Sequence, residues 1–186
     1  MRVVGGNLSG RRLASPKSDA IRPTTDRARE SLFNILKHSY PGAVEGARVL
    51  DLFSGSGALG IEAVSRGASY CLFVEEAAGA RALIRENVES LGLQGRTRIF
   101  RRDATHLGPI GTMQPFNLVF ADPPYGRGLG EKAVASALVG GWLTADALIV
   151  VEEAAATPFK PPEGVVIHEM RTYSSSTLAF CGLVRV

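Results

Sequence analysis

Five short apolar runs, interspersed with helix-like stretches, constrain the fold of this chain more than any other feature. The runs are rich in Val, Ile, Leu and Phe and lie at residues 48–53, 70–75, 97–100, 116–121 and 147–152. Strands that are apolar along their whole length are typical of a parallel sheet with both faces covered. Helical patterns lie at residues 58–66, 77–91 and 131–139. The pattern therefore predicts a doubly wound α/β fold.

The last part of the chain departs from this alternation. Residues 165–173 and 177–186 are both strand-like, and only the serines at 174–176 separate them. So short a connection cannot hold the helical crossover that parallel strands require, so the two segments should pair as an antiparallel hairpin. Together with the five earlier strands, this predicts a mostly parallel, seven-stranded sheet with an antiparallel C-terminal edge hairpin.

The first part of the chain is basic. Residues 1–37 hold eight Lys or Arg against three Asp or Glu, a net charge of +5, whereas the rest of the chain carries −2. A basic segment on a near-neutral body is typical of a protein that binds a polyanion, although a solvated Arg-rich terminus has the same composition.

Two structural elements are expected within this basic segment. Residues 2–13 contain glycines that suit a small hairpin, and residues 26–38 carry apolar side chains at helical spacing. We therefore divide the chain into a basic N-terminal arm at 1–40, made of a hairpin and a helix packed on the core, and an α/β domain at 41–186. A length of 186 residues leaves room for one domain of ordinary size.

Composition excludes several other classes of protein. No apolar run approaches the roughly 20 residues of a membrane span, and the first residues lack the apolar core of a signal peptide. Cys71 and Cys181 lie inside apolar runs, which suits reduced core residues better than a disulfide framework. The three histidines lack the spacing of metal ligands. We therefore expect a cytoplasmic protein without a metal and without a membrane partner.

A glycine-rich loop follows the first predicted strand. The pattern G-x-G-x-x-G falls on Gly55, Gly57 and Gly60 and opens a predicted helix, and Glu75 ends the next strand. This arrangement is typical of nucleotide-binding sites. The glycines allow close approach of the ligand, and the acidic residue accepts hydrogen bonds from ribose hydroxyls.

Asp51, at the end of the first predicted strand, narrows the choice of ligand. A carboxylate beside the loop would repel the pyrophosphate of NAD or FAD, which prefers unopposed N–H groups at a helix terminus. It suits a ligand with a cationic amino group and a sulfonium, such as S-adenosylmethionine. Asp51 could also bond the amides of its own loop, as acidic residues beside turns often do, and the two roles are compatible.

A second motif, Asp122-Pro123-Pro124-Tyr125, follows the fourth predicted strand, at the edge where α/β sheets bind ligands. The prolines hold the chain extended and remove two N–H donors, so a carboxylate and a rigid carbonyl can together accept hydrogen bonds from an amino group. Tyr125 offers a flat face for a base, a contact worth about 1–3 kcal/mol. Drawing the amine hydrogens out of the ring plane would restore the nucleophilicity of an aromatic amine.

Together these motifs resemble the class I, Rossmann-like methyltransferases that use S-adenosylmethionine to methylate amino groups. Four N-terminal segments resemble the RsmD family specifically. They are RVVGG at 2–6, GRRL at 10–13, RPTTDR at 22–27 and RESLFN at 29–34. The turn between the last two strands departs from the family pattern, because three serines follow Tyr173 where the family has glycine and an acidic residue.

The resemblance implies how the first motif binds its cofactor. Asp51 and the first two loop glycines would line the methionine end of S-adenosylmethionine, Glu75 would bind the ribose, and Asp103 with the amide of Ala104 would bind the adenine. The expected cofactor-binding residues are Asp51, Phe53, Gly55, Gly57, Glu75, Asp103 and Ala104.

For the second motif, the resemblance implies that Asp122 and the Pro123 carbonyl hold the target amine while Tyr125 stacks on its base. These three are the expected catalytic residues. The expected substrate-binding residues are Arg11, Arg12, Arg22, Thr24, Asp26 and Pro124. Direct methyl transfer needs no covalent intermediate, so proximity and orientation would supply most of the rate.

The family methylates N2 of a guanine in bacterial 16S rRNA, guanine 966 being the family target, so the resemblance implies this reaction. The expected partner is 16S rRNA within a small-subunit assembly intermediate, and the expected state is a monomer. Adenine N6 in DNA and a protein amide are alternative targets, because both offer an amino group to the same motif. An NAD-linked oxidoreductase, suggested by the glycines alone, and a non-catalytic RNA-binding factor, suggested by the arm alone, are further alternatives.

Overall fold

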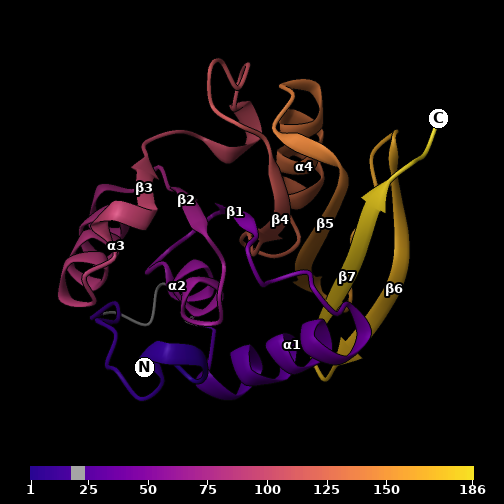
Figure 1. Ribbon diagram of the computed structural model, residues 1–186. Helices are drawn as coiled ribbons and strands as arrows, with labels where there is room; N and C mark the ends of the chain where they lie inside the picture. The colour runs from indigo at the N-terminus through magenta and orange to yellow at the C-terminus, as the bar shows by residue number, and fades with distance from the viewer. Residues whose placement is uncertain (18–23) are drawn as a thin grey trace.

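One seven-stranded sheet organises the protein (Figure 1). The computed structural model describes residues 1–17 and 24–186. The strands are β1 (Arg48–Leu52), β2 (Tyr70–Val74), β3 (Thr97–Phe100), β4 (Phe116–Ala121), β5 (Leu143–Ala154), β6 (Val165–Tyr173) and β7 (Ser176–Leu183). They lie in the order β3-β2-β1-β4-β5-β7-β6. Strands β1 to β5 are parallel, and β7 is antiparallel to both β5 and β6, which confirms the predicted sheet.

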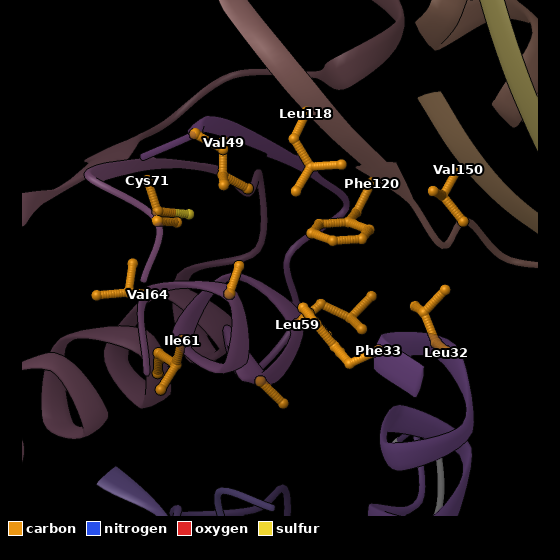
Figure 2. Packing of buried hydrophobic residues seen from close by; sticks show 14 of the residues in the cluster. Leu32, Phe33, Val49, Leu59, Ile61, Val64, Cys71, Leu118, Phe120 and Val150 are labelled. Atoms are coloured by element: carbon orange, nitrogen blue, oxygen red, sulfur yellow. The ribbon is translucent and has the colours of Figure 1, made fainter. Parts of the chain in front are cut away.

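Helices cover both faces of this sheet. The α-helices of the described residues are α1 (Asp26–Ser39), α2 (Ala58–Ser65), α3 (Ala78–Ser90) and α4 (Leu129–Val139). Successive strand residues point to opposite faces, so β1 sends Val49 into the core under α1, α2 and α3, and Leu50 into the core under α4. Figure 2 shows the first core, where Phe33 of α1 and Leu59 of α2 lie below Phe120 of β4.

Strand β5 is longer than the sequence predicted. It begins at Leu143 rather than at residue 147, because Leu143 pairs with Phe116 across an irregularity in the β4–β5 register. The buried Trp142 stacks on Phe116 just before this pairing, with ring centroids 6.2 Å apart. A polar Thr144 and Asp146 interrupt the apolar run, which explains why hydrophobic periodicity alone misses the start of the strand.

The first residues form the small hairpin that the sequence predicted, with backbone hydrogen bonds between residues 1–3 and 10–13. A single antiparallel bridge joins Arg2 to Arg12, and a 3₁₀ turn, η1 (Gly6–Leu8), lies between them. The backbone amides of Val4 and Gly5 donate to the buried carboxylate of Glu62 on α2 at 2.9 and 3.2 Å. The hairpin is therefore fastened to the helix that follows the glycine loop.

Helix α1 connects this hairpin to the far edge of the sheet. The Thr25 hydroxyl caps it by accepting from the Ala28 amide at 3.1 Å. At its other end Tyr40 stacks on Phe180 of β7 and donates to Glu169 of β6 at 3.0 Å. Figure 1 shows α1 running from the neighbourhood of α2 to the β6–β7 hairpin.

Candidate active site

A cavity of about 660 Å³ lies where the carboxyl ends of β1, β2, β4 and β5 meet. Ligands of doubly wound sheets bind at this edge, and the volume is in the range of small-molecule sites. Residues from both sequence motifs, from the start of α1 and from the β6–β7 turn line it. They are Thr24, Thr25, Ala28, Phe53, Gly55, Glu75, Ala77, Ala80, Asp122, Pro123, Pro124, Tyr125, Glu152, Tyr173, Ser174, Ser175 and Ser176.

The glycine loop is held open by its backbone conformation. Gly55 and Gly57 have φ angles of 58° and 82°, in the left-handed region that favours glycine. Phe53 has a φ of 57°, which a bulky residue rarely adopts and which costs on the order of 1–3 kcal/mol. A side chain at Gly55 would meet no atom within 4 Å, so the backbone there faces open space on the cavity side.

Glu75 fastens this loop to the next strand. Its carboxylate accepts from the amide of Gly55 at 2.8 Å and from the amide of Ala77 at 3.1 Å. Both bonds orient the carboxylate at the cavity wall, at the strand end where the sequence predicted a ribose-binding acid.

Asp51 lies beneath the loop rather than in the cavity wall. Its side chain is buried and accepts from the Gly60 amide at 3.2 Å, the loop-bonding role that the sequence left open. Burial raises the pKa of Asp51 well above its ordinary value; the Gly60 amide opposes this shift, and the negative charges of Asp122 and Glu75 add to it. Asp122 and Glu75 therefore place negative charge close to the buried Asp51 at this end of the site.

Asp103 and Ala104, the predicted adenine-binding pair, do not line the cavity. Asp103 caps η3 (Ala104–His106), where its Oδ1 accepts from the hydroxyl and the amide of Thr105 at 2.7 and 2.9 Å. These two bonds lower the pKa of Asp103. The amide of Ala104 and the carboxylate of Asp103 follow β3, the strand next to the one that carries Glu75.

The second motif lines the same cavity at the end of β4, the strand next to β1. Asp122 accepts a hydrogen bond from the Thr24 hydroxyl at 3.0 Å, so the arm reaches the motif directly. Pro123 is buried, whereas Pro124 is exposed. The Tyr125 phenol donates to the Glu152 carboxylate at 2.6 Å, and the following amide of Gly126 donates to Glu153. The loop is thus held at both of its ends by side chains from other elements.

A buried arginine positions the arm beside this motif. Arg29 donates from Nη1 to the carbonyl of Thr24 at 2.8 Å, and from Nη2 to Asp26 at 2.8 Å and to the carbonyl of Arg2. Its Nε lies 3.9 Å from the equally buried carboxylate of Glu62. The same side chain that anchors α1 therefore fixes the backbone of the residue that contacts Asp122.

The other predicted substrate-binding residues are spread more widely. Asp26 is turned toward the arm itself, because its Oδ1 accepts from Arg29 and from the Arg2 amide. Arg11 and Arg12 are exposed and do not line the cavity, and Arg11 donates to the carbonyl of Ser90 at the end of α3. Arg22 lies outside the described residues.

Two contributors were missed in the sequence. Glu152 was not among the predicted site residues, but it lines the cavity and accepts a hydrogen bond from Tyr125. The turn after Tyr173 also borders the cavity, and Ser174 takes a φ of 47° there. The three serines after Tyr173 depart from the family pattern, and this departure was the sequence signal that the turn could differ at the site. For Glu152 the signal was its position at the end of a strand beside the second motif.

A smaller cavity of about 370 Å³ adjoins the first. It lies between α1 and the β6–β7 hairpin and is bounded by Arg27, Leu32 and Leu178. The two cavities share Thr24, Thr25, Ala28, Glu152, Tyr173 and Ser176. Glu152 therefore stands at the boundary between them.

In the residues that the structure describes, no group of three or more His, Cys, Asp or Glu side chains is placed to hold a metal ion. Over the same residues no helix has the length and apolar character needed to cross a bilayer.

The fold and the site together define a Rossmann-like methyltransferase domain, and comparisons with known proteins agree. A family model described as "Conserved hypothetical protein 95" matches residues 1–182. The chain therefore belongs to this family, the RsmD family that its motifs resemble, and it is a methyltransferase.

Individual relatives support this assignment. The chain is 42% identical over 153 residues to Ribosomal RNA small subunit methyltransferase D of Escherichia coli (strain K12), which covers 82% of this chain and 74% of the relative. It is 32% identical over 174 residues to the Haemophilus influenzae protein of the same name, covering 92% and 88%. The solved structure of the E. coli protein YhhF, described as a methyltransferase, superposes with a TM-score of 0.83 at 33% identity, covering 98% of this chain and 97% of that one.

Proposed function

We propose that this protein transfers a methyl group from S-adenosylmethionine to the exocyclic N2 amine of a guanine in small-subunit rRNA. One observation carries the proposal: the glycine loop with Glu75 and the Asp122–Tyr125 motif form two walls of a single cavity. A nucleotide cofactor and an amino-group acceptor bound at these walls would lie next to each other. Guanine 966 of 16S rRNA is the target that the family suggests.

The chemistry of the first wall fits this cofactor. Glu75 is fixed by two amides and keeps lone pairs for the ribose hydroxyls, while Phe53 and Gly55 border the same space. Burial is the main cause of the raised pKa of Asp51, and the negative charges of Asp122 and Glu75 add to it. Those two charges favour a ligand with a cationic sulfonium and amino group over one with a pyrophosphate. When bound, S-adenosylmethionine supplies the methyl group. Asp103 and Ala104 remain the proposed contacts of its adenine.

The chemistry of the second wall fits an aromatic amine. The Thr24 hydroxyl orients the Asp122 carboxylate, and the Pro123 carbonyl belongs to a chain segment that proline keeps rigid. The two oxygens would accept the two amine hydrogens and draw them out of the plane of the base. The lone pair of the nitrogen then becomes available, and the ring of Tyr125, tethered through its phenol to Glu152, would hold the base in place.

An RNA partner is supported by the arm and by the relatives. The E. coli and H. influenzae relatives are named as rRNA small subunit methyltransferases. Arg11, Arg12 and Arg27 are exposed on the basic arm, and Arg27 also borders the smaller cavity. Exposed cations beside a cavity are suited to the phosphates that flank a base inside it.

A substrate panel tests the proposal. Labelled methyl transfer would be measured to small ribosomal subunits from cells that lack this enzyme, to the rRNA extracted from them, to DNA and to a protein with an amide acceptor. We expect label in the rRNA of the subunits, and digestion to nucleosides should release N2-methylguanosine. Label that appears as N6-methyladenine in DNA, or on protein only, would contradict the proposal.

A further inference from the structure

Glu152 lies beside Asp122 because of the register of the sheet. Ala121, the last residue of β4, pairs with Val151 of β5 in parallel register; Asp122 directly follows β4, and Glu152 is the next residue of β5. Residues at the same register of adjacent strands point to the same side. Both carboxylates accordingly line the same cavity.

Each of these carboxylates is oriented by a hydroxyl group. The Thr24 hydroxyl donates to Asp122 Oδ2 at 3.0 Å, and the Tyr125 phenol donates to Glu152 Oε1 at 2.6 Å. One hydrogen bond occupies only part of the acceptor capacity of a carboxylate, which has about four lone-pair sites. Glu152 can therefore accept further donors from a ligand.

The neighbouring Glu153 shows what a purely supporting carboxylate looks like here. It is buried, and its Oε1 accepts from the backbone amides of Gly126 and Ala154 at 2.9 and 2.7 Å. Glu153 does not line either cavity, whereas Glu152 lines both. Glu153 thus supports the loop, whereas Glu152 forms part of the cavity wall.

Purines differ in what they present next to the reacting amine. Guanine places the N1–H donor beside its N2 amino group, whereas adenine places an unprotonated N1 acceptor beside its N6 amino group. An ionised carboxylate accepts hydrogen bonds and cannot donate them. A carboxylate next to the amine clamp would thus bind the guanine edge and repel the adenine edge, because a polar site rejects an analogue that leaves its groups unpaired.

We propose that Glu152 is a specificity-determining residue that accepts the N1–H of the target guanine while Asp122 and the Pro123 carbonyl hold its N2 amine. This inference rests on the proposed function and deepens it. It supplies a physical reason why the same four-residue motif serves guanine in this protein and not adenine.

The test compares two bases at the target position. Small subunits would be reconstituted with rRNA carrying either guanine or 2-aminopurine, which keeps the 2-amino group but has an unprotonated N1. The wild-type enzyme should methylate guanine at least about 10-fold faster, since a hydrogen bond to a charged group contributes roughly 1.5–3 kcal/mol. In Glu152→Gln the new amide can donate to N1, so this preference should fall by about 10- to 100-fold, within the range those energies give.

Two control variants separate base reading from other effects. Tyr125→Phe removes the phenol that holds Glu152 but keeps the carboxylate, so it should slow both substrates and preserve the guanine preference. Glu163→Gln makes the same chemical change at an exposed position and should leave both rates unchanged. Because both bases are compared on the same protein preparation, the ratio does not depend on the folded fraction.

The outcomes are distinguishable. An unchanged guanine preference in Glu152→Gln, whether the rates fall equally or not at all, would overturn the role of Glu152 and leave the proposed function standing. If the wild-type enzyme does not methylate guanine in the reconstituted subunits, the proposed function is overturned, and this inference with it.

Discussion

Thr24 and Asp122 are 98 residues apart in the chain, yet the hydroxyl of one donates to the carboxylate of the other. The same kind of pairing recurs around the cavity, where Tyr125 donates to Glu152 and the Gly55 amide donates to Glu75. At the scale of single residues, the acceptors of this site are oriented before a ligand arrives. A reaction that depends on proximity and orientation benefits directly from such preorganisation.

Thr24→Val tests whether the hydrogen bond that orients Asp122 contributes to catalysis. Loss of the hydroxyl should lower kcat about 5- to 10-fold, because one hydrogen bond contributes roughly 1–1.5 kcal/mol. The KM for the cofactor should change little, since Thr24 acts on Asp122 and not on the glycine loop or Glu75. Steady-state kinetics would measure both constants. Thr24→Ser restores the donor and should recover most of the rate; an equally slow Thr24→Ser would show that the hydroxyl is not what matters.

Gly60 illustrates a different single-residue constraint. A Cβ at this position would lie 2.5 Å from the sulfur of Cys71 and 2.6 Å from the ring of Phe73. We expect Gly60→Ala to lower the free energy of unfolding by about 1–3 kcal/mol through overpacking. Urea denaturation would measure the change.

Gly79 provides the matched control. It lies in α3, and a Cβ there would meet no atom within 4 Å. Gly79→Ala should therefore be neutral or stabilising by up to about 1 kcal/mol. Equal destabilisation by the two alanines would contradict the packing argument.

At the scale of secondary structure, the sequence predicted every strand and α-helix of the sheet domain because their signals are local. Apolar runs mark strands such as 70–75, and a connection of three serines requires a hairpin. What escaped prediction depends on contacts between distant segments. Strand β5 starts early because Leu143 pairs with Phe116, and Glu152 enters the site through its register with β4.

The predicted hairpin at residues 2–13 is confirmed by the antiparallel backbone bonds between its two arms, but the contact that attaches it to α2 was not predicted. The amides of Val4 and Gly5 donate to the carboxylate of Glu62 on α2 and so attach the hairpin to the core. A buried carboxylate on α2 that collects these donors leaves no sequence signal near the arm itself.

Helix α1 and the N-terminal hairpin should behave as one element held by Arg29. Arg29→Met would remove its bonds to Thr24, Asp26 and Arg2 and leave the buried Glu62 with a weaker set of partners. We expect the free energy of unfolding to fall by about 3–5 kcal/mol, as when one partner of a buried ion pair is lost. Amide hydrogen exchange should also accelerate in residues 1–13 more than in β1 or β4.

A second variant makes this prediction decisive. Lys37→Met removes a charge from the exposed end of the same helix and should leave both stability and exchange nearly unchanged. Exchange that accelerates equally in the arm and in the central strands of Arg29→Met would indicate a global effect and contradict the anchoring role.

At the scale of the whole molecule, charge is divided between a basic arm and a near-neutral domain. This division predicts that the arm supplies the salt-dependent part of RNA binding. Arg11→Gln combined with Arg12→Gln should weaken binding of rRNA and reduce the slope of log K against log salt by about 1.4, at roughly 0.7 per single-strand phosphate contact. Binding titrations at several salt concentrations would measure the slope; an unchanged slope would place the phosphate contacts elsewhere.

The central claim is that the cofactor and the target amine bind in one cavity, at the glycine loop with Glu75 and at the Asp122–Tyr125 motif. Asp122→Ala tests this claim most directly. Transfer of labelled methyl to small subunits would be measured together with binding of S-adenosylmethionine on the same preparation. We expect N2-methylguanosine to disappear while cofactor binding is retained, because in the proposed site Asp122 would hold the amine and Glu75 would hold the ribose. Undiminished transfer in Asp122→Ala would contradict the claim.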